Sequence, residues 1–77
     1  ADLILKTPRI RKGRAMILEL KTVKRFQEME KGCREALAQI VKKKYRKELR
    51  QEGYQDIVGC GVCFYRKECL VRVQTRG

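Results

Sequence analysis

One long helix-forming segment lies between two pairs of strand-forming segments, and this order limits the folds that the chain can adopt. Aliphatic and β-branched residues form runs at 3–5 and 15–21, and again at 57–65 and 70–74. From about Gln27 to Glu52, apolar residues recur at every fourth position, and Gly53 follows as a natural stop. This apolar row consists of Met29, Cys33, Leu37, Val41, Tyr45 and Leu49. We therefore predict an α/β fold with the order strand, strand, helix, strand, strand, in which one long helix packs on a small mixed sheet.

Two carboxylates and an ammonium group fall at the ends of the first two predicted strands. Asp2 precedes the first strand, and Glu19 and Lys21 close the second. Side chains two residues apart on a strand share a face, so Glu19 and Lys21 are expected to project together. Pairing the two strands as a hairpin would bring Asp2 beside Glu19. Oxygen ligands of this kind suit Mg²⁺ or Mn²⁺, and a neighbouring lysine can neutralise charge that develops on a phosphate.

The charge balance favours an anionic partner. The 77 residues include 20 Lys and Arg against 9 Asp and Glu, which gives a net charge of +11. Such a charge attracts phosphate backbones, and without a base-reading motif the contacts should be directed to the backbone. The candidate contacts, in a loop and in the helical segment, are Arg11, Lys12, Arg14, Lys42, Lys43 and Lys44. For the helical lysines, a solvated helix face that happens to be basic is the alternative interpretation.

Composition excludes several classes of protein. A hydrophobic content of 43% argues against wholesale disorder, and 77 residues correspond to one small domain. The absence of His excludes His-based nucleases and Ser–His or Cys–His triads. No apolar stretch approaches the roughly 20 residues needed to cross a bilayer, so no membrane association is expected. No signal peptide is visible, and we expect a cytoplasmic protein.

The four cysteines invite a zinc hypothesis, which the spacing opposes. Cys60 and Cys63 lie on a predicted strand with opposite parity, so their sulfur atoms should point to different faces. Cys33 and Cys69 do not form a second closely spaced pair of the kind that zinc sites use. Without a secretory signal, reduced and mostly buried thiols are the favoured interpretation.

Taken in order, these segments resemble the PD-(D/E)XK nuclease superfamily, which has the restriction-endonuclease-like fold. The resemblance covers nearly the whole chain, and more narrowly it is to the nuclease-like domain that follows an AAA-ATPase-like domain in many bacterial proteins. The matching segments are Ala1–Leu5, Ile17–Lys21, Met29–Ile40, Tyr45–Leu49 and Gly61–Cys69.

This resemblance implies Mg²⁺-dependent hydrolysis of phosphodiester bonds in nucleic acid, with DNA as the expected substrate, by a metal-activated water. Asp2, Glu19 and the main-chain carbonyl of Leu20 would hold the metal, and Lys21 would act on the nucleophile. Gln39 joins the candidate site because related nucleases often place a Gln in this helix. A preceding helix and a first strand would be missing, so residues 1–77 would be a single, truncated domain. An ATPase-like domain would be its neighbour in the parent chain.

Resemblance to a nuclease family does not establish nuclease activity, and two alternative functions are considered. A catalytically silent module that keeps the fold could bind nucleic acid through charge alone, or regulate another domain. Alternatively, an open sheet edge could pair with another chain and produce a homo-oligomer.

Overall fold

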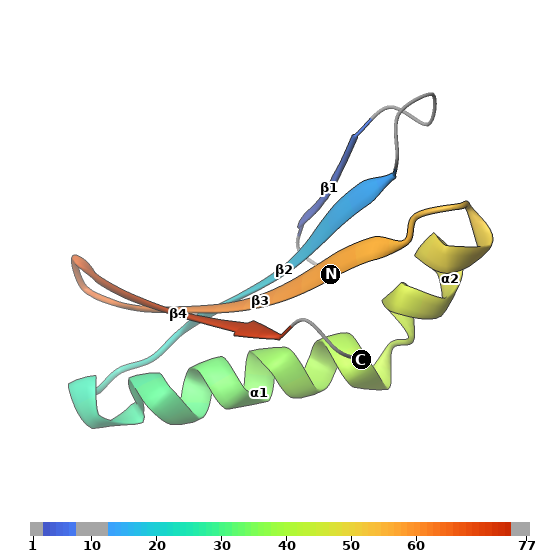
Figure 1. Ribbon diagram of the computed structural model, residues 1–77. Coiled ribbons are helices and arrows are strands. Elements are labelled where there is room, and N and C mark those ends of the chain that lie inside the picture. Colours follow the sequence, from blue (N-terminus) through green and yellow to red (C-terminus); the bar gives the residue numbers. More distant parts are fainter. Residues whose placement is uncertain (1–2, 8–12, 75–77) are drawn as a thin grey trace.

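The computed structural model describes residues 3–7 and 13–74, which form a four-stranded sheet with helices on one face (Figure 1). The strands are β1 (Leu3–Lys6), β2 (Arg14–Thr22), β3 (Asp56–Tyr65) and β4 (Glu68–Gln74), in the order β1-β2-β3-β4. The 3₁₀ turn η1 (Phe26–Glu28) leads into α1 (Met29–Lys42), which is followed by α2 (Tyr45–Gln51). The outer pairs β1–β2 and β3–β4 are antiparallel, and β2–β3 is parallel. The predicted α/β fold class and the mixed sheet are confirmed.

The prediction of one continuous helix over residues 27–52 is wrong. Lys44 adopts a left-handed backbone conformation with φ of 57°, which ends the α1 hydrogen-bond ladder and starts a second, separate helix. The predicted i, i+4 row is buried at Met29, Cys33 and Leu49, but it does not stay on one face, because each step of four residues rotates about 40° around a helix with 3.6 residues per turn. Val41 has therefore rotated away from the sheet and is 48% exposed. The buried row of α1 uses mixed spacings of three and four residues and consists of Met29, Cys33, Ala36 and Ile40.

Alternation along β2 determines which side chains face the helices. Ala15 and Ile17 are buried and share a core cluster with Ile40 of α1, so the odd-numbered residues of β2 face α1. In β3 the odd-numbered residues do the same, since Cys63 packs with Cys33 of α1. Cys60 has the opposite parity on this continuous strand and points to the other face, as predicted. The hydrophobic core of the described residues therefore lies between the sheet and the helices.

Glycines allow α1 to approach β3 closely. A Cβ atom built at Gly61 would lie 2.6 Å from the main-chain oxygen of Cys33, and one built at Gly59 would lie 2.9 Å from the Arg46 Nη2 atom. From the helix side, a Cβ atom at Gly32 would lie 2.6 Å from the Cys63 Sγ atom. The glycine-lined face of β3 is thus the surface on which α1 rests.

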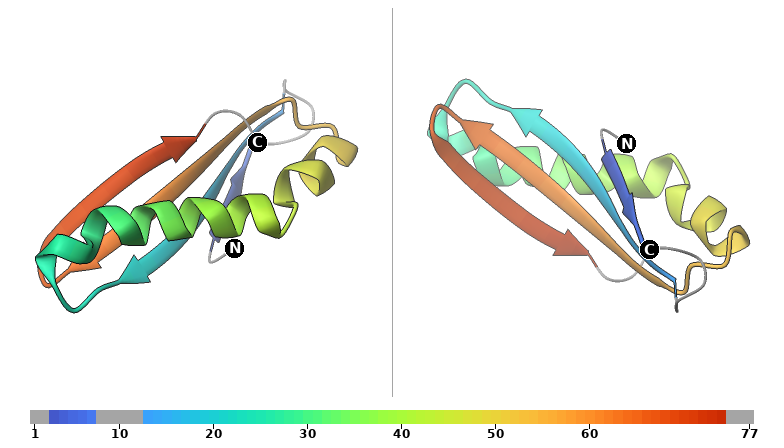
Figure 2. Two further views of the ribbon diagram at one scale, coloured as in Figure 1. Left: turned by 90° about the horizontal axis from the view of Figure 1, so that it is seen from below. Right: turned by 90° about the horizontal axis from the view of Figure 1, so that it is seen from above.

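The opposite face of the sheet is apolar and is not covered by any helix of the described residues. Figure 2 shows this side in its right-hand view, where α1 lies behind the strands. By register, the even-numbered residues of β2 and the odd-numbered residues of β1 and β4 share this face. Its exposed large side chains are Leu3, Leu5, Met16, Leu20, Val71 and Val73.

Within the described ranges, no helix is long and apolar enough to cross a membrane.

We predict that the destabilising effect of Gly32→Ala depends on Cys63. Alanine favours a helix interior by about 1 kcal/mol over glycine, but here the new methyl group would collide with the Cys63 sulfur. Cys63→Ala alone should destabilise by leaving a small cavity. In the double variant the collision is gone, so the two losses should differ from their sum by about 1 kcal/mol or more in the stabilising direction. Urea unfolding of the four proteins measures this coupling, and simple additivity would contradict the close approach of α1 and β3.

Candidate functional site

Glu19 and Lys21 lie on the face of β2 that α1 covers, because both continue the odd-numbered series of Ala15 and Ile17. Glu19 is only 8% exposed, which is unusual for a carboxylate. Its register partner in β3 is Gly61, where α1 rests on the strand. The Glu19 carboxylate is therefore held beside the helix, whereas Lys21, one step further along the face, is half-buried.

Gln39 lies on the edge of α1 that faces β2. The opposite edge of the helix faces β4, since Glu30 forms an ion pair with Arg72 at 2.6 Å. Gly32, in contrast, approaches Val23, which directly follows β2. Gln39 follows Gly32 by seven residues, or about two turns, so both belong to the same stripe of the helix. The half-buried Gln39 and the pair on β2 thus occupy the same side of the layer between helix and sheet.

Glu35 is a neighbour of this group that sequence analysis missed. Burial raises the pKa of the Cys63 thiol; among the smaller influences, the Lys21 ammonium lowers it and the Glu35 carboxylate raises it. Lys21 is the register partner of Cys63 and is half-buried, whereas Glu35 is exposed on α1. The signal that would have identified Glu35 is its position four residues before Gln39, on the same stripe of the helix.

The remaining predicted ligands are placed as follows. Asp2 lies outside the described residues; the β1–β2 register is described from Leu3, which pairs with Leu18. Leu20 points its side chain to the uncovered face and is 43% exposed, so only its main chain is relevant to a metal. Among the described residues no group of three or more His, Cys, Asp or Glu side chains is arranged to hold a metal ion.

This donor set fits Mg²⁺ better than a metal that requires a complete protein cage. Mg²⁺ keeps several waters and is commonly held by only one or two carboxylates together with substrate phosphates. One buried carboxylate at position 19 with an adjacent main-chain carbonyl satisfies that modest requirement. Tetrahedral zinc requires four protein ligands in structural sites, which the cysteines on opposite faces of β3 do not supply.

The predicted phosphate contacts fall in two separate regions. Arg14, at the start of β2, forms an exposed ion pair with Asp56 through its Nε atom at 2.7 Å. Lys42, Lys43 and Lys44 are exposed at the end of α1 and in the turn before α2. Arg11 and Lys12 lie outside the described residues.

Arg46 follows these exposed lysines in the sequence but has a buried side chain. It is 5% exposed and donates hydrogen bonds to the main-chain oxygens of Ile57 at 2.8 Å and Gln74 at 2.7 Å. A charged residue type is expected at the surface, but Arg46 is a buried residue of α2, the helix that begins after the left-handed Lys44.

Comparison with known proteins gives one family. Residues 1–74 match the family model described as PD-(D/E)XK nuclease superfamily. Neither the curated proteins nor the solved structures contain a match to this chain. Because the family model covers nearly all of the sequence, and the fold places Glu19 and Lys21 together on one face of β2, the chain belongs to the PD-(D/E)XK nuclease superfamily.

Proposed function

We propose that this domain hydrolyses phosphodiester bonds of nucleic acid, expected to be DNA, in a reaction that requires Mg²⁺ or Mn²⁺. The observation that carries this proposal is the buried Glu19 carboxylate, which shares a strand face with Lys21 in a member of a nuclease superfamily. A buried carboxylate also supplies oxygen ligands of the kind that a hard divalent cation prefers.

Each residue has a distinct part in the proposed reaction. Glu19, the main-chain carbonyl of Leu20 and Asp2 are the proposed ligands of the cation. When bound, the divalent ion would lower the pKa of a water molecule and offset negative charge on the scissile phosphate. Lys21 would orient the attacking water and stabilise the charge that grows on the phosphate oxygens. The Gln39 amide, from the facing edge of α1, would hydrogen-bond to the nucleophile or to the phosphate.

The basic side chains are proposed to attract and bind the nucleic acid and to take no part in the hydrolysis itself. Arg11, Lys12, Arg14 and the lysines at 42–44 are proposed to contact the phosphate backbone, which makes binding dependent on salt and tolerant of sequence. In the parent chain we expect an ATPase-like domain as the neighbour, as the narrower family resemblance implies.

Removal of the metal tests this proposal. Supercoiled plasmid DNA incubated with the protein in Mg²⁺ should be nicked, EDTA should abolish nicking, and excess Mg²⁺ should restore it. Binding of the same DNA, measured by mobility shift in EDTA, should persist because the basic residues do not need the cation. Binding without cleavage in Mg²⁺ or in Mn²⁺ would overturn the proposal and would assign the domain as a catalytically silent binding module.

A further inference from the structure

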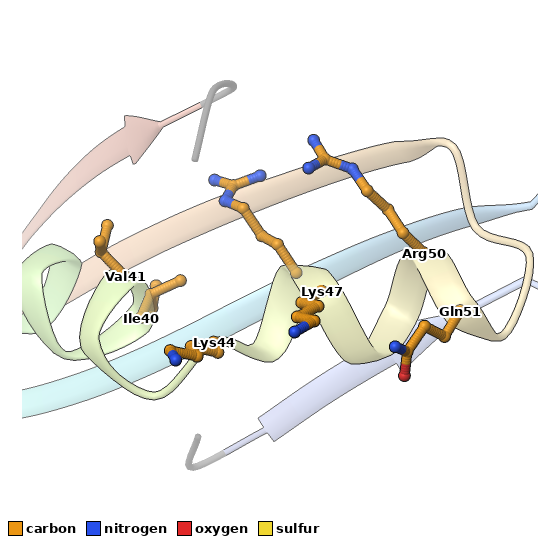
Figure 3. A pocket seen from close by; sticks show the side chains of 7 residues that line it. Ile40, Val41, Lys44, Lys47, Arg50 and Gln51 are labelled. Carbon is orange, nitrogen blue, oxygen red and sulfur yellow. The ribbon is translucent and has the colours of Figure 1, made fainter.

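An open, cationic pocket lies at the junction of α1 and α2, away from Glu19 and Lys21. It encloses about 440 Å³. Figure 3 shows Ile40 and Val41 from the last turns of α1 on one side of this space, and Lys47 and Arg50 from α2 on the other. The lining residues are Ile40, Val41, Lys44, Arg46, Lys47, Arg50 and Gln51. Four of these seven side chains are cationic and none is acidic, so the pocket is suited to an anion.

A buried guanidinium forms the floor of the pocket. Arg46 is 5% exposed, and its Nε atom has no hydrogen-bond partner. The two described partners of its other nitrogens are main-chain oxygens, and within the described ranges no carboxylate forms an ion pair with it. A buried cation without an opposite charge is unfavourable. Burial lowers the pKa of Arg46, and the nearby Arg50 cation lowers it further, as expected where a counter-ion is lacking.

The backbone conformation on both sides of the pocket positions the Arg46 guanidinium. The left-handed Lys44 separates the two helices, and α2 then carries Arg46 and Arg50 four residues apart on one stripe. Beneath Arg46 the sheet has Gly59, where a Cβ atom would come within 2.9 Å of the guanidinium. Arg46 therefore occupies a space that the strand leaves open for it, and its charge reinforces that of Arg50 and Lys47 above.

We propose that this pocket binds a phosphate group of the nucleic acid at a position separate from the scissile one, with Arg50 and Lys47 as direct contacts and Arg46 as the fixed charge beneath them. Guanidinium groups match the geometry of phosphate oxygens through paired N–H donors. The aliphatic Val41, which is 48% exposed and lines the pocket, offers apolar contact to an adjoining sugar. This proposal rests on the proposed function in one respect, namely that the phosphate belongs to a nucleic acid.

The pocket would fix how the strand lies relative to the cleavage site. Cys33 and Ala36 of α1 lie over Gly61, the register partner of Glu19, whereas the pocket begins at Ile40 and extends along α2. With a rise of 1.5 Å per residue, Ile40 lies roughly 6–10 Å along α1 from Ala36 and Cys33, which corresponds to one or two nucleotides of a single strand. A second anchor at that spacing would set the register of the bond that enters the active site.

A charge-matched pair of variants tests the proposal. Lys47→Gln/Arg50→Gln removes two exposed charges from the pocket, and Lys24→Gln/Arg25→Gln removes two exposed charges elsewhere. Binding of a fluorescent single-stranded oligonucleotide is measured by anisotropy in EDTA over a series of salt concentrations. The pocket variant should bind about tenfold more weakly and lose about 0.7 from the slope of log K against log salt, as for one phosphate no longer neutralised. The control variant should keep the wild-type slope. Equal effects of the two variants would overturn the proposal.

Two further measurements identify the phosphate and separate this inference from the proposed function. If oligonucleotides with and without a 5′-phosphate bind equally, and the pocket variant weakens both, the site holds an internal phosphodiester. If the 5′-phosphate improves binding and the pocket variant erases the gain, the site holds a terminal phosphate; both results support the site. Plasmid cleavage in Mg²⁺ is assayed in parallel. Intact cleavage with no pocket-specific loss of binding overturns the pocket alone, whereas absent cleavage with pocket-specific binding overturns the proposed function alone.

Discussion

Replacing Glu19 by Gln should lower the rate of DNA cleavage by about 10²–10³-fold, and replacing Lys21 by Gln should have an effect of the same order. Glu19→Gln keeps the size and shape of a side chain that is 8% exposed, so the packing beside α1 should survive. What changes is the charge, since a neutral amide is a poor ligand for a hard cation. Lys21→Gln leaves the proposed ligands in place and removes the ammonium that would stabilise charge on the phosphate.

The same Glu→Gln and Lys→Gln changes at positions remote from the site serve as controls. They distinguish an effect on the site from a general effect of removing a charge. Glu48→Gln on α2 and Lys24→Gln after β2 make the same chemical changes at exposed residues. Both should cleave within about twofold of the wild-type rate, because surface charges contribute little to a remote site. Thermal unfolding of all four variants verifies that each is folded. Wild-type cleavage by folded Glu19→Gln would remove the carboxylate from the mechanism.

Gly61→Ala should be the most destabilising single-methyl change in the sheet, with a loss of about 3 kcal/mol in the free energy of unfolding. The added Cβ would lie 2.6 Å from the Cys33 carbonyl oxygen, which belongs to the backbone of α1 and cannot rotate away. The helix would have to lift from β3 or shift along it. For a domain of this size, total stability is about 4–12 kcal/mol, so the change removes a large share of it. Urea unfolding measures the loss, with a fall of roughly 12–24 °C in the melting temperature expected alongside.

A second substitution shows whether the helix backbone is the cause. Ala36→Gly removes another contact of the new methyl group, at 3.1 Å, but leaves the Cys33 oxygen where it is. Gly61→Ala/Ala36→Gly should therefore be no more stable than Gly61→Ala alone. Recovery of stability in the double variant, or a loss below about 0.5 kcal/mol in Gly61→Ala, would mean that α1 does not rest on β3 at this position. Because Gly61 pairs with Glu19, the same change should also impair cleavage.

The strands were predictable from the sequence because their signal is local. The runs of aliphatic and β-branched residues located each strand to within a residue or two at each end. The helix break was not predictable from periodicity, since residues on both sides of Lys44 have helix-compatible patterns. The break accompanies a tertiary contact that periodicity does not reveal, namely the hydrogen bonds of Arg46 to the main chain of Ile57 and Gln74.

The site was predictable only in part, for reasons that differ among its residues. Parity on one strand is sufficient to place Glu19 and Lys21 on a common face. Placing Gln39 near them requires knowing how α1 lies across the sheet, and that is determined by close contacts at Gly32 and Gly61. The cationic pocket could not be found from charge counting, because its central residue is a buried arginine in a sequence rich in exposed ones.

Paramagnetic broadening by Mn²⁺ tests most directly whether the Glu19 carboxylate holds a divalent cation. In NMR spectra of the ¹⁵N-labelled protein, substoichiometric Mn²⁺ should first broaden the amide signals of Leu18–Lys21, together with those of the facing edge of α1 around Gln39. Glu19→Gln should abolish that selectivity. Broadening that begins instead at exposed carboxylates such as Glu48, with the same pattern in wild type and in Glu19→Gln, would contradict the account.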